Sequence, residues 1–350
     1  MTTFDTAAAL IAGGIRDRAY PAASVEVGRR DAVLWREVFG TLTYDVGAAK
    51  TETSTIFDLA SLTKVIATAT LIMQAVDRRG LDLDEPIAAR FDSWRGVDRD
   101  MVTVRDLLSH CSGLTGYLPF FNDHTGRAEF EPAICRLALE YPPRSQSIYS
   151  DLGFMLLGFL LEDLGGAPLP NQFEAIQGLV GSEPLAFRPP KAWRPRVAPT
   201  EVDRWRGRLL VAEAHDENTW ALGGAAGHAG LFGTVGAVGA FGRLVLQTLS
   251  GDSPLARRAT LMEFARKRDE IPGSSRALGW DTMLPTSSCG RRLSATAIGH
   301  TGFTGTSLWV DPDQDLYVAL LTNRVHPTRD NDNLKRLRPL IHDAIVDALR

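Results

Sequence analysis

The pattern of hydrophobic and polar residues changes along the chain from strand-like to helix-like and back. Short segments rich in β-branched and aromatic residues predict strands over 24–29, 32–39, 277–283, 306–310 and 316–322. Longer apolar segments predict helices over 62–76, 104–109, 152–164 and 333–349. The predicted strands thus lie near the two ends of the chain, and most of the predicted helices lie between them.

This distribution predicts an α/β (α+β) fold with one sheet built from both ends of the chain. We expect residues 1–80 and 271–350 to form the sheet domain, and residues 81–270 to form an inserted, mostly helical lobe. Four prolines make the segment 187–208 an irregular excursion. Glycine at every third position from Gly224 to Gly242 predicts a tight loop leading into a helix whose glycine face packs closely.

Composition narrows the class of protein. Hydrophobic residues make up 44% and charged residues 23% of the 350 positions, which is ordinary globular usage and excludes disorder as the main state. The net charge of −4 argues against a nucleic-acid-binding protein, which would carry a basic surface. The apolar runs are far shorter than the roughly 20 residues that span a bilayer, so we expect no membrane span.

The N-terminus and the cysteines bear on location. The first residues include an acid, Asp5, and no basic region of the kind that opens a secretory signal. The three cysteines include no C-x-x-C pair and fit buried thiols in a reducing compartment. We therefore expect a cytoplasmic protein.

Several common signatures of enzymes are absent. The chain has no G-x-S-x-G elbow, no H-E-x-x-H and no Cys/His set with zinc spacing. It also lacks the glycine-rich loops that bind phosphate groups or dinucleotides. Metal, nucleotide and common α/β-hydrolase chemistry therefore have no support in the sequence.

One motif remains, the tetrad Ser61-Leu62-Thr63-Lys64. It stands where a strand-like stretch meets an apolar helix, and residues three apart share a helical face, so Lys64 can reach the Ser61 hydroxyl. A serine in the first helical turn also meets the positive end of the helix dipole. Lys64 would lie in a largely apolar helix, where an unpaired buried ammonium group loses its proton readily. Alternatively, Ser61 caps the helix and Lys64 extends to solvent, and the tetrad alone does not decide between the two interpretations.

Two further motifs add to the first. Tyr149-Ser150-Asp151 precedes an apolar helix, where Ser150 or Asp151 can serve simply as a helix cap. His300-Thr301-Gly302 lies in a stretch whose glycines allow a substrate backbone to approach a strand closely. Taken alone, each of these two motifs fits a structural role better than a functional one.

Together and in this order, S-x-x-K, Y-S-D and H-T-G resemble the serine β-lactamase and penicillin-binding protein superfamily. The resemblance is to its class C β-lactamase-like branch, which also contains D-alanyl-D-alanine carboxypeptidases, D-aminopeptidases and family VIII-type carboxylesterases. It extends to longer blocks, among them FDLASLTK at 57–64, TVRDLLSHCSGL at 103–114, YSDLGFMLLG at 149–158 and AAGHAGLFGT at 225–234. It covers roughly residues 20–325.

The resemblance implies a β-lactamase/transpeptidase-like fold, with an antiparallel sheet, a helical lobe and the serine between them. It also implies covalent catalysis in which Ser61 attacks a carbonyl group and is acylated, while Lys64 and Tyr149 transfer protons. By the pattern of the family, the backbone amides of Ser61 and Phe303 form the oxyanion hole. It assigns four residues to substrate binding: Asp151, His300, Thr301 and Gly302. It requires no metal and no cofactor.

Two positions depart from the class C pattern. His300 stands where class C β-lactamases carry lysine, and imidazole is largely neutral at pH 7 but gains charge toward pH 5.5. Asp151 stands where they carry asparagine, and we expect this acid to disfavour anionic substrates. Both departures argue against efficient β-lactam hydrolysis and leave the acylating residues intact.

We therefore expect a serine hydrolase that forms an acyl-enzyme on Ser61 and hydrolyses small esters or amides. Candidate substrates are an ester, a β-lactam or a D-amino-acid peptide. The alternative is a penicillin-recognising sensor that is acylated without turnover. The sequence favours a structural role for His110 and argues against direct catalysis by His228. It favours a solvated loop over a metal site for His215-Asp216-Glu217.

Overall fold

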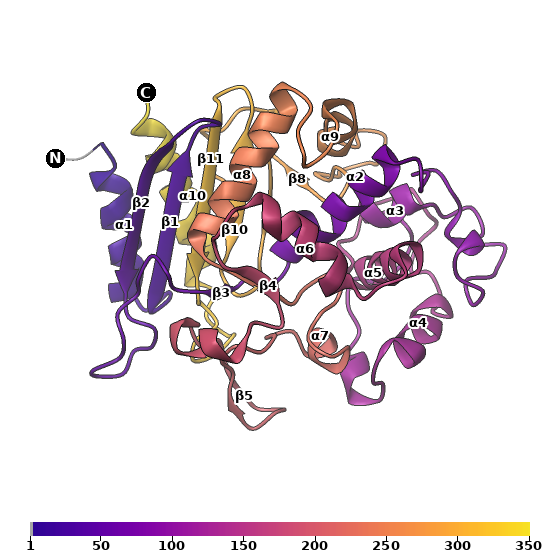
Figure 1. Cartoon of the computed structure of the whole chain (residues 1–350), viewed down its shortest axis with the longest axis horizontal. Coiled ribbons are helices and arrows are strands. Elements are labelled where there is room, and N and C mark those ends of the chain that lie inside the picture. The colour runs from indigo at the N-terminus through magenta and orange to yellow at the C-terminus, as the bar shows by residue number, and fades with distance from the viewer. Residues whose placement is uncertain (1–2) are drawn as a thin grey trace.

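The computed structural model describes residues 3–350, and a six-stranded antiparallel sheet forms its left half in Figure 1. The order of the strands is β2-β1-β11-β10-β9-β8. Their bounds are Ala22–Gly28 for β1, Val33–Gly40 for β2, Asp281–Thr282 for β8, Ile298–Thr301 for β9, Ser307–Asp311 for β10 and Leu316–Thr322 for β11. The two N-terminal strands pair directly with the last strand, so the prediction of one sheet from both ends is confirmed.

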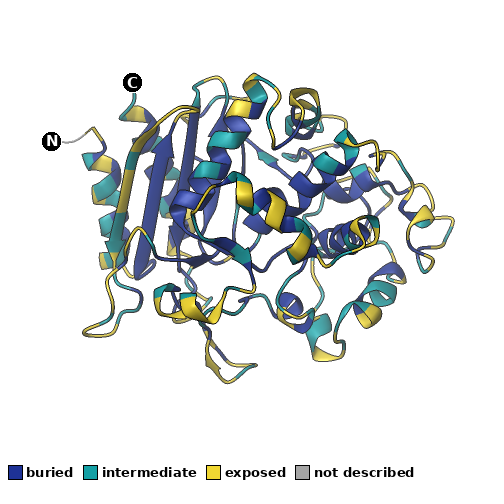
Figure 2. Cartoon of the chain, in the orientation of Figure 1, coloured by how far each residue is buried: buried dark blue, intermediate teal, exposed yellow. Residues whose placement is uncertain are grey.

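Alternating side chains of the sheet enter two separate hydrophobic cores. On β11, Val318 and Leu320 pack in the core shared with α1 (Asp5–Arg16) and α10 (Asn333–Asp347). Their neighbours on the opposite face pack in the larger core, which continues into the helical half. A strand buried on both faces is apolar at almost every position, and Figure 2 shows the central strands dark blue against the exposed edge strand β2.

The glycine-rich run ends in a helix that lies on the sheet. α8 (Val235–Ser250) packs against β1, β10 and β11, with Thr234 as its N-cap (Figure 1). A Cβ on Gly239 would lie 2.0 Å from Glu26 Oε1, and one on Gly242 would lie 3.1 Å from Leu308 Cδ1. The expected close glycine face is therefore present.

The helix α8 falls within residues 81–270 but covers the sheet, so the inserted segment is not wholly a separate lobe. The division of the chain at residues 80 and 270 otherwise stays a prediction.

The close approach of α8 predicts that Gly239→Ala lowers stability. Glu26 is fully buried and accepts a hydrogen bond from Tyr317, so its carboxylate has little room to move away from a new methyl group. Overpacking of this kind costs about 1–3 kcal/mol in the free energy of unfolding. Gly178→Ala in another helix is the matched control, because its Cβ would contact nothing within 4 Å. Urea denaturation of both variants measures the difference; equal stabilities would contradict the packing argument.

The helical half lies to the right in Figure 1. Its helices are α2 (Thr70–Asp77), α3 (Val104–Leu108), α4 (Arg127–Cys135), α5 (Asp151–Gly165), α6 (Leu169–Leu179), α7 (Glu217–Ala221) and α9 (Arg258–Ala265). Two small sheets accompany them, β3 (Phe57–Asp58) with β7 (Leu231–Gly233) and β4 (Leu185–Phe187), and β5 (Val202–Asp203) with β6 (Arg208–Leu209). The strand β3 leads from the sheet half directly into the helices.

Two sequence predictions need correction. The helix expected over 62–76 contains a π-helical stretch, Lys64–Ala69, before α2 begins. The strand expected over 277–283 is only the two-residue β8, because Ala277 and Gly279 instead bond to Trp280 and Leu108 in a turn. The irregular excursion over 187–208 is confirmed apart from short strand and 3₁₀ segments.

Among the described residues, no single helix is both long and apolar enough to cross a bilayer. Within residues 3–350, α5 and α6 taken together are long and apolar enough, but the chain bends by 88° between them.

Candidate active site

Ser61 lies in a sharp turn between β3 and the apolar helix. Ala60, just before it, has a φ of 45°, a left-handed conformation that non-glycine residues rarely adopt. The turn is held by the buried Asp58, whose carboxylate accepts hydrogen bonds from the Ala60 amide at 2.8 Å and from the His215 amide at 2.7 Å. Such strained residues cluster at functional sites, where the surrounding structure enforces them.

Lys64 points back from the first turn of this helix toward the serine. Its side chain is fully buried, and its Nζ donates to Ser61 Oγ at 3.1 Å. It also donates to Asp151 Oδ1 at 2.6 Å and to the carbonyl oxygen of His228 at 3.1 Å. Lysine therefore does not extend to solvent here, and the structural alternative for the tetrad is wrong for Lys64.

Asp151 is brought to Lys64 by the start of α5. Ser150 is the N-cap of this helix and its hydroxyl accepts from the Gly153 amide, which fixes the direction of the first turn. Ser150 is thus a helix cap, as the structural interpretation of the Y-S-D motif held. Its neighbours Tyr149 and Asp151 instead contact Lys64. Because Lys64 balances the charge of Asp151, this carboxylate is not a free anion facing the substrate.

Tyr149 is enclosed by aromatic and cationic groups. Its ring centroid lies 4.8 Å from Lys64 Nζ, 4.7 Å from the His110 ring and 5.8 Å from the His300 ring. The guanidinium carbon of Arg276 lies 5.0 Å over the same ring. These contacts fix the plane of the phenol beside Ser61 and Lys64.

The surroundings shift two pKa values in the same direction. Burial by itself lowers the pKa of Lys64, but the Asp151 charge and Tyr149 together raise it more, so the pKa of Lys64 is raised. Burial raises the pKa of Tyr149, and interactions with Lys64 and Ser61 offset this only in part. Both groups therefore hold their protons at neutral pH, whereas the sequence suggested an unpaired lysine that readily loses its proton.

His300 is a neutral imidazole in this site. Burial, Lys64 and Arg276 hold the pKa of His300 well below its usual range. Its Nδ1 lies 2.8 Å from the carbonyl oxygen of Thr301, which can only accept, so Nδ1 carries the proton and Nε2 has a free lone pair. The expectation that His300 becomes charged toward pH 5.5 is therefore wrong, because burial beside two cations opposes protonation.

The turn after β9 lies directly against the turn that carries Ser61. A Cβ on Gly302 would lie 2.6 Å from the carbonyl oxygen of Leu59, so only glycine fits. The Thr304 and Thr306 hydroxyls donate to the carbonyls of Asp58 and Leu59 at 2.7 and 3.0 Å. Within residues 3–350, neither the Ser61 amide nor the Phe303 amide has a hydrogen-bond acceptor. Both amides are thus available to an oxyanion.

Sequence reasoning missed three residues of this site. Asp58 and Arg276 belong to none of the motifs, and His110 was assigned a purely structural role. His110 does have one, since its Nδ1 accepts from the Ser150 amide at 3.0 Å, but its ring also supports Tyr149. The positive φ at Ala60 has no sequence signal. The blocks FDLASLTK and TVRDLLSHCSGL, which contain Asp58 and His110, were the available hints.

The other histidines turn away from the serine. The His228 ring lies 2.8 Å from Asp216 Oδ1 and 3.1 Å from Thr219 Oγ1, so only its backbone oxygen enters the site. His215 pairs with Glu201 at 2.9 Å and stacks on the Phe303 ring. The absence of a catalytic role for the His228 ring agrees with the sequence analysis, whereas the solvated loop expected over 215–217 is wrong, because His215 and Glu217 are buried.

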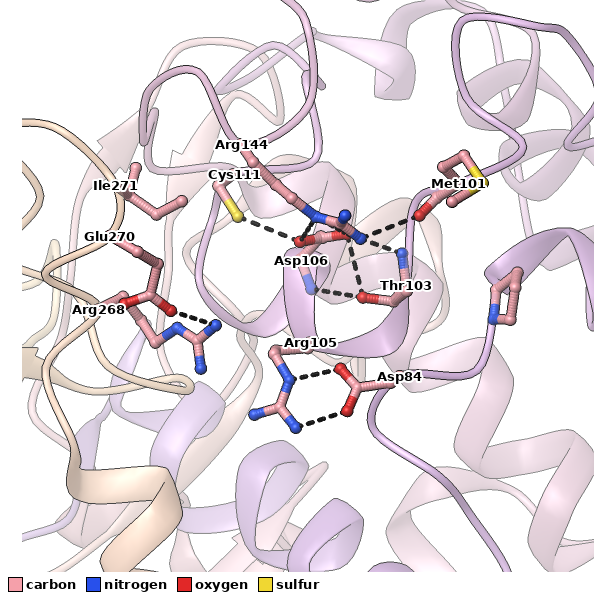
Figure 3. A pocket seen from close by; sticks show the side chains of 11 residues that line it. Asp84, Met101, Thr103, Arg105, Asp106, Cys111, Arg144, Arg268, Glu270 and Ile271 are labelled. Atoms are coloured by element: carbon pink, nitrogen blue, oxygen red, sulfur yellow. Dashed lines mark hydrogen bonds and ion pairs between the residues drawn. The ribbon is translucent and has the colours of Figure 1, made fainter.

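A pocket of about 610 Å³ lies beside α3 (Figure 3), and Ser61, Lys64, Tyr149 and Asp151 are not among the residues that line it. Its three arginines are each paired with an acid: Arg105 with Asp84, Arg144 with Asp106 and Arg268 with Glu270. Burial raises the pKa of the Cys111 thiol in its wall to about 12, so this cysteine is not a nucleophile at neutral pH. The pocket holds no candidate for the chemistry.

Comparison with known proteins identifies the family. The sequence model described as Beta-lactamase matches residues 7–342, nearly the whole chain. The chain belongs to the β-lactamase family. The resemblance drawn from the three motifs is therefore confirmed, and the protein is an enzyme of the serine hydrolase class.

Relatives within the β-lactamase family include peptidase-like proteins. An Escherichia coli (strain K12) protein named "Putative D-alanyl-D-alanine carboxypeptidase" is 29% identical, over 89% of this chain and 80% of its own. A Salmonella typhi protein of the same name is 27% identical over the same shares.

Solved structures confirm the predicted fold. EstCE1, a hydrolase with promiscuous acyltransferase activity, superposes with a TM-score of 0.77 at 19% identity, covering 98% of both chains. A class C β-lactamase from Rhodobacter sphaeroides reaches 0.77 at 18% identity, over 99% of this chain and all of its own.

Proposed function

We propose that this enzyme hydrolyses a small ester or amide through an acyl-enzyme on Ser61, with Lys64 and Tyr149 as the proton-transfer pair. The observation that carries the proposal is the hydrogen bond of 3.1 Å between Lys64 Nζ and Ser61 Oγ, buried beside the Tyr149 ring. A nucleophile needs a base within hydrogen-bond reach, held by a third group, and Asp151 holds this lysine.

The chemistry follows from this arrangement. Once one of Lys64 and Tyr149 has lost its proton, it takes the proton of Ser61 as Oγ bonds to the carbonyl carbon and the carbonyl electrons move onto oxygen. The free Ser61 and Phe303 amides stabilise that oxyanion. The proton then passes to the leaving group as its bond to carbon breaks. Water repeats the sequence, releases the acid and restores Ser61.

Arg276 favours substrates that carry a carboxylate near the scissile bond. Its guanidinium lies over Tyr149, its side chain is partly exposed, and its ion pair with Asp281 is long at 4.0 Å. It is therefore a cation with unused N–H donors beside a neutral His300. Together with the name of the relatives, this supports a D-alanyl-D-alanine carboxypeptidase-like activity. A carboxylesterase with incidental β-lactam activity is the second candidate, supported by the neutral imidazole of His300.

The role of Arg276 predicts a selective effect of Arg276→Gln. We expect kcat/KM to fall roughly 10- to 150-fold for N-acetyl-D-alanyl-D-alanine, the loss expected for one charged hydrogen bond. The variant should turn over N-acetyl-D-alanyl-D-alanine amide, which lacks the C-terminal carboxylate, at nearly the wild-type rate. Arg276→Lys retains the charge and serves as the control. An equal loss for both substrates would mean that Arg276 only supports Tyr149.

Covalent labelling tests the proposed function itself. A fluorophosphonate should leave one adduct, located by mass spectrometry on the peptide that carries Ser61. An adduct on any other residue would contradict the assignment. Steady turnover of p-nitrophenyl esters, nitrocefin or D-amino-acid amides would distinguish an enzyme from a penicillin-recognising sensor, which stays acylated after one event.

A further inference from the structure

Lys64 Nζ has three hydrogen-bond partners, and only the bond with Ser61 can reverse its direction. The Asp151 carboxylate and the His228 carbonyl can only accept, so each occupies one N–H of the lysine in either protonation state. Ser61 Oγ can accept from an ammonium group or donate to a neutral amine. One proton can therefore pass between Ser61 and Lys64 without displacement of either heavy atom.

Asp151 is the negative charge in this arrangement. It is the first residue of α5, where the positive end of the helix dipole favours a carboxylate, and its amide donates to the Gly116 carbonyl at 2.9 Å. Its side chain is only 19% exposed, so water screens its interaction with Lys64 incompletely. Among the residues that the structure describes, it is the only acid paired with Lys64.

The remaining titratable groups around Lys64 do not replace Asp151. They come from the end of α3, the segment before α5, β9 and the segment before β8: His110, Tyr149, His300 and Arg276. Burial and the neighbouring cations hold the pKa of both histidines well below the usual range, so these rings are neutral. Arg276 is positive and disfavours a second cation nearby. The ammonium form of Lys64 therefore depends on Asp151.

We propose that Asp151 is a positioning residue that sets the pH at which Ser61 becomes reactive. By stabilising the ammonium form of Lys64, it requires the Ser61–Lys64–Tyr149 group to lose one proton before attack can begin. Acylation should then rise with pH along a limb centred above neutrality. This inference rests on the proposed acyl-enzyme function.

The directions of the two pKa shifts agree with the inference. The Asp151 charge raises the pKa of Lys64, and it also raises the pKa of Tyr149. Removal of that charge lowers both values, whichever of the two groups is the base. The proton lost to solvent leaves a lone pair on Tyr149 Oη or on Lys64 Nζ, and that lone pair accepts the Ser61 proton during attack.

The test is the pH dependence of acylation in Asp151→Asn, which keeps the size of the side chain and removes its charge. The midpoint of the rising limb of kcat/KM should move to lower pH by about 1–3 units, the effect of one opposite charge at this distance. Asp151→Glu keeps the charge and should keep the wild-type midpoint. Asp92→Asn changes the net charge equally at a fully exposed site and should also keep it.

An unchanged midpoint in Asp151→Asn, whatever its rate, would overturn the inference. If the variant is too slow to assay, the ¹³Cζ signal of Tyr149, assigned with Tyr149→Phe, reports the same equilibrium. It should begin to titrate at lower pH in Asp151→Asn than in the wild type, and identical titrations would again overturn the inference. Failure of the proposed function is distinct, because it would appear as no Ser61 adduct in the wild type at any pH.

Discussion

Ser61→Ala should abolish turnover of every substrate, with kcat reduced by about 10³- to 10⁶-fold. The Ser61 hydroxyl is the proposed nucleophile, and without it the buried Lys64 and the oxyanion amides can assist only slow attack by water. The measurement is steady-state hydrolysis of the most reactive ester, combined with loss of the fluorophosphonate adduct.

The control for this variant is stability. Among the residues that the structure describes, Ser61 caps no helix through its side chain, and its hydroxyl hydrogen-bonds with Lys64 and Tyr149, so the melting temperature should change little. A variant that folds normally and retains more than a few per cent of wild-type kcat would show that another residue is the nucleophile.

Tyr149→Phe should reduce the acylation rate by about 10²- to 10⁴-fold, the usual contribution of a general acid or base. The substitution removes the hydroxyl beside Ser61 and Lys64 but keeps the ring that packs on His110, His300 and Arg276. The loss should therefore appear in single-turnover acylation and not in the free energy of unfolding.

Tyr20→Phe is the matched control for Tyr149→Phe. Its hydroxyl donates to the Ile11 carbonyl at 3.1 Å in the core under α1, so its removal should cost about 1 kcal/mol of stability and leave acylation unchanged. Near-wild-type acylation in Tyr149→Phe would reduce Tyr149 to a packing residue and leave Lys64 as the proton acceptor.

The motifs identified in the sequence were enough to find the family because each one has a local physical cause. Serine and lysine three residues apart share a helical face, and Ser150 caps the helix that follows Tyr149. The H-T-G motif needs a glycine at position 302, because a side chain there would collide with the carbonyl oxygen of Leu59. Periodicity likewise predicted β1, β2, β11, α5 and α10 within a few residues.

Other features of the site have no local cause and could not be predicted. The neighbouring Asp58 accepts from the Ala60 amide, but the positive φ of Ala60 also depends on distant parts of the chain, because the His215 amide holds Asp58 and the β9–β10 turn packs against this segment. Arg276 lies over Tyr149, 127 residues away in the chain, where β8 just after it pairs with β9. The cytoplasmic location is a matter of targeting, which the fold does not decide, and it stays a prediction.

The sequence by itself determined the identity of the nucleophile candidate, its family and the sheet built from both ends of the chain. The tertiary structure decided the charge state of the site, because a pKa depends on burial and on charges that arrive from elsewhere in the chain. The sequence led us to expect a base made neutral by burial, a free acid at Asp151 and a titrating His300. Packing instead joins Lys64 to Asp151 and buries His300 near the cations Lys64 and Arg276, so the lysine is charged and the histidine is neutral.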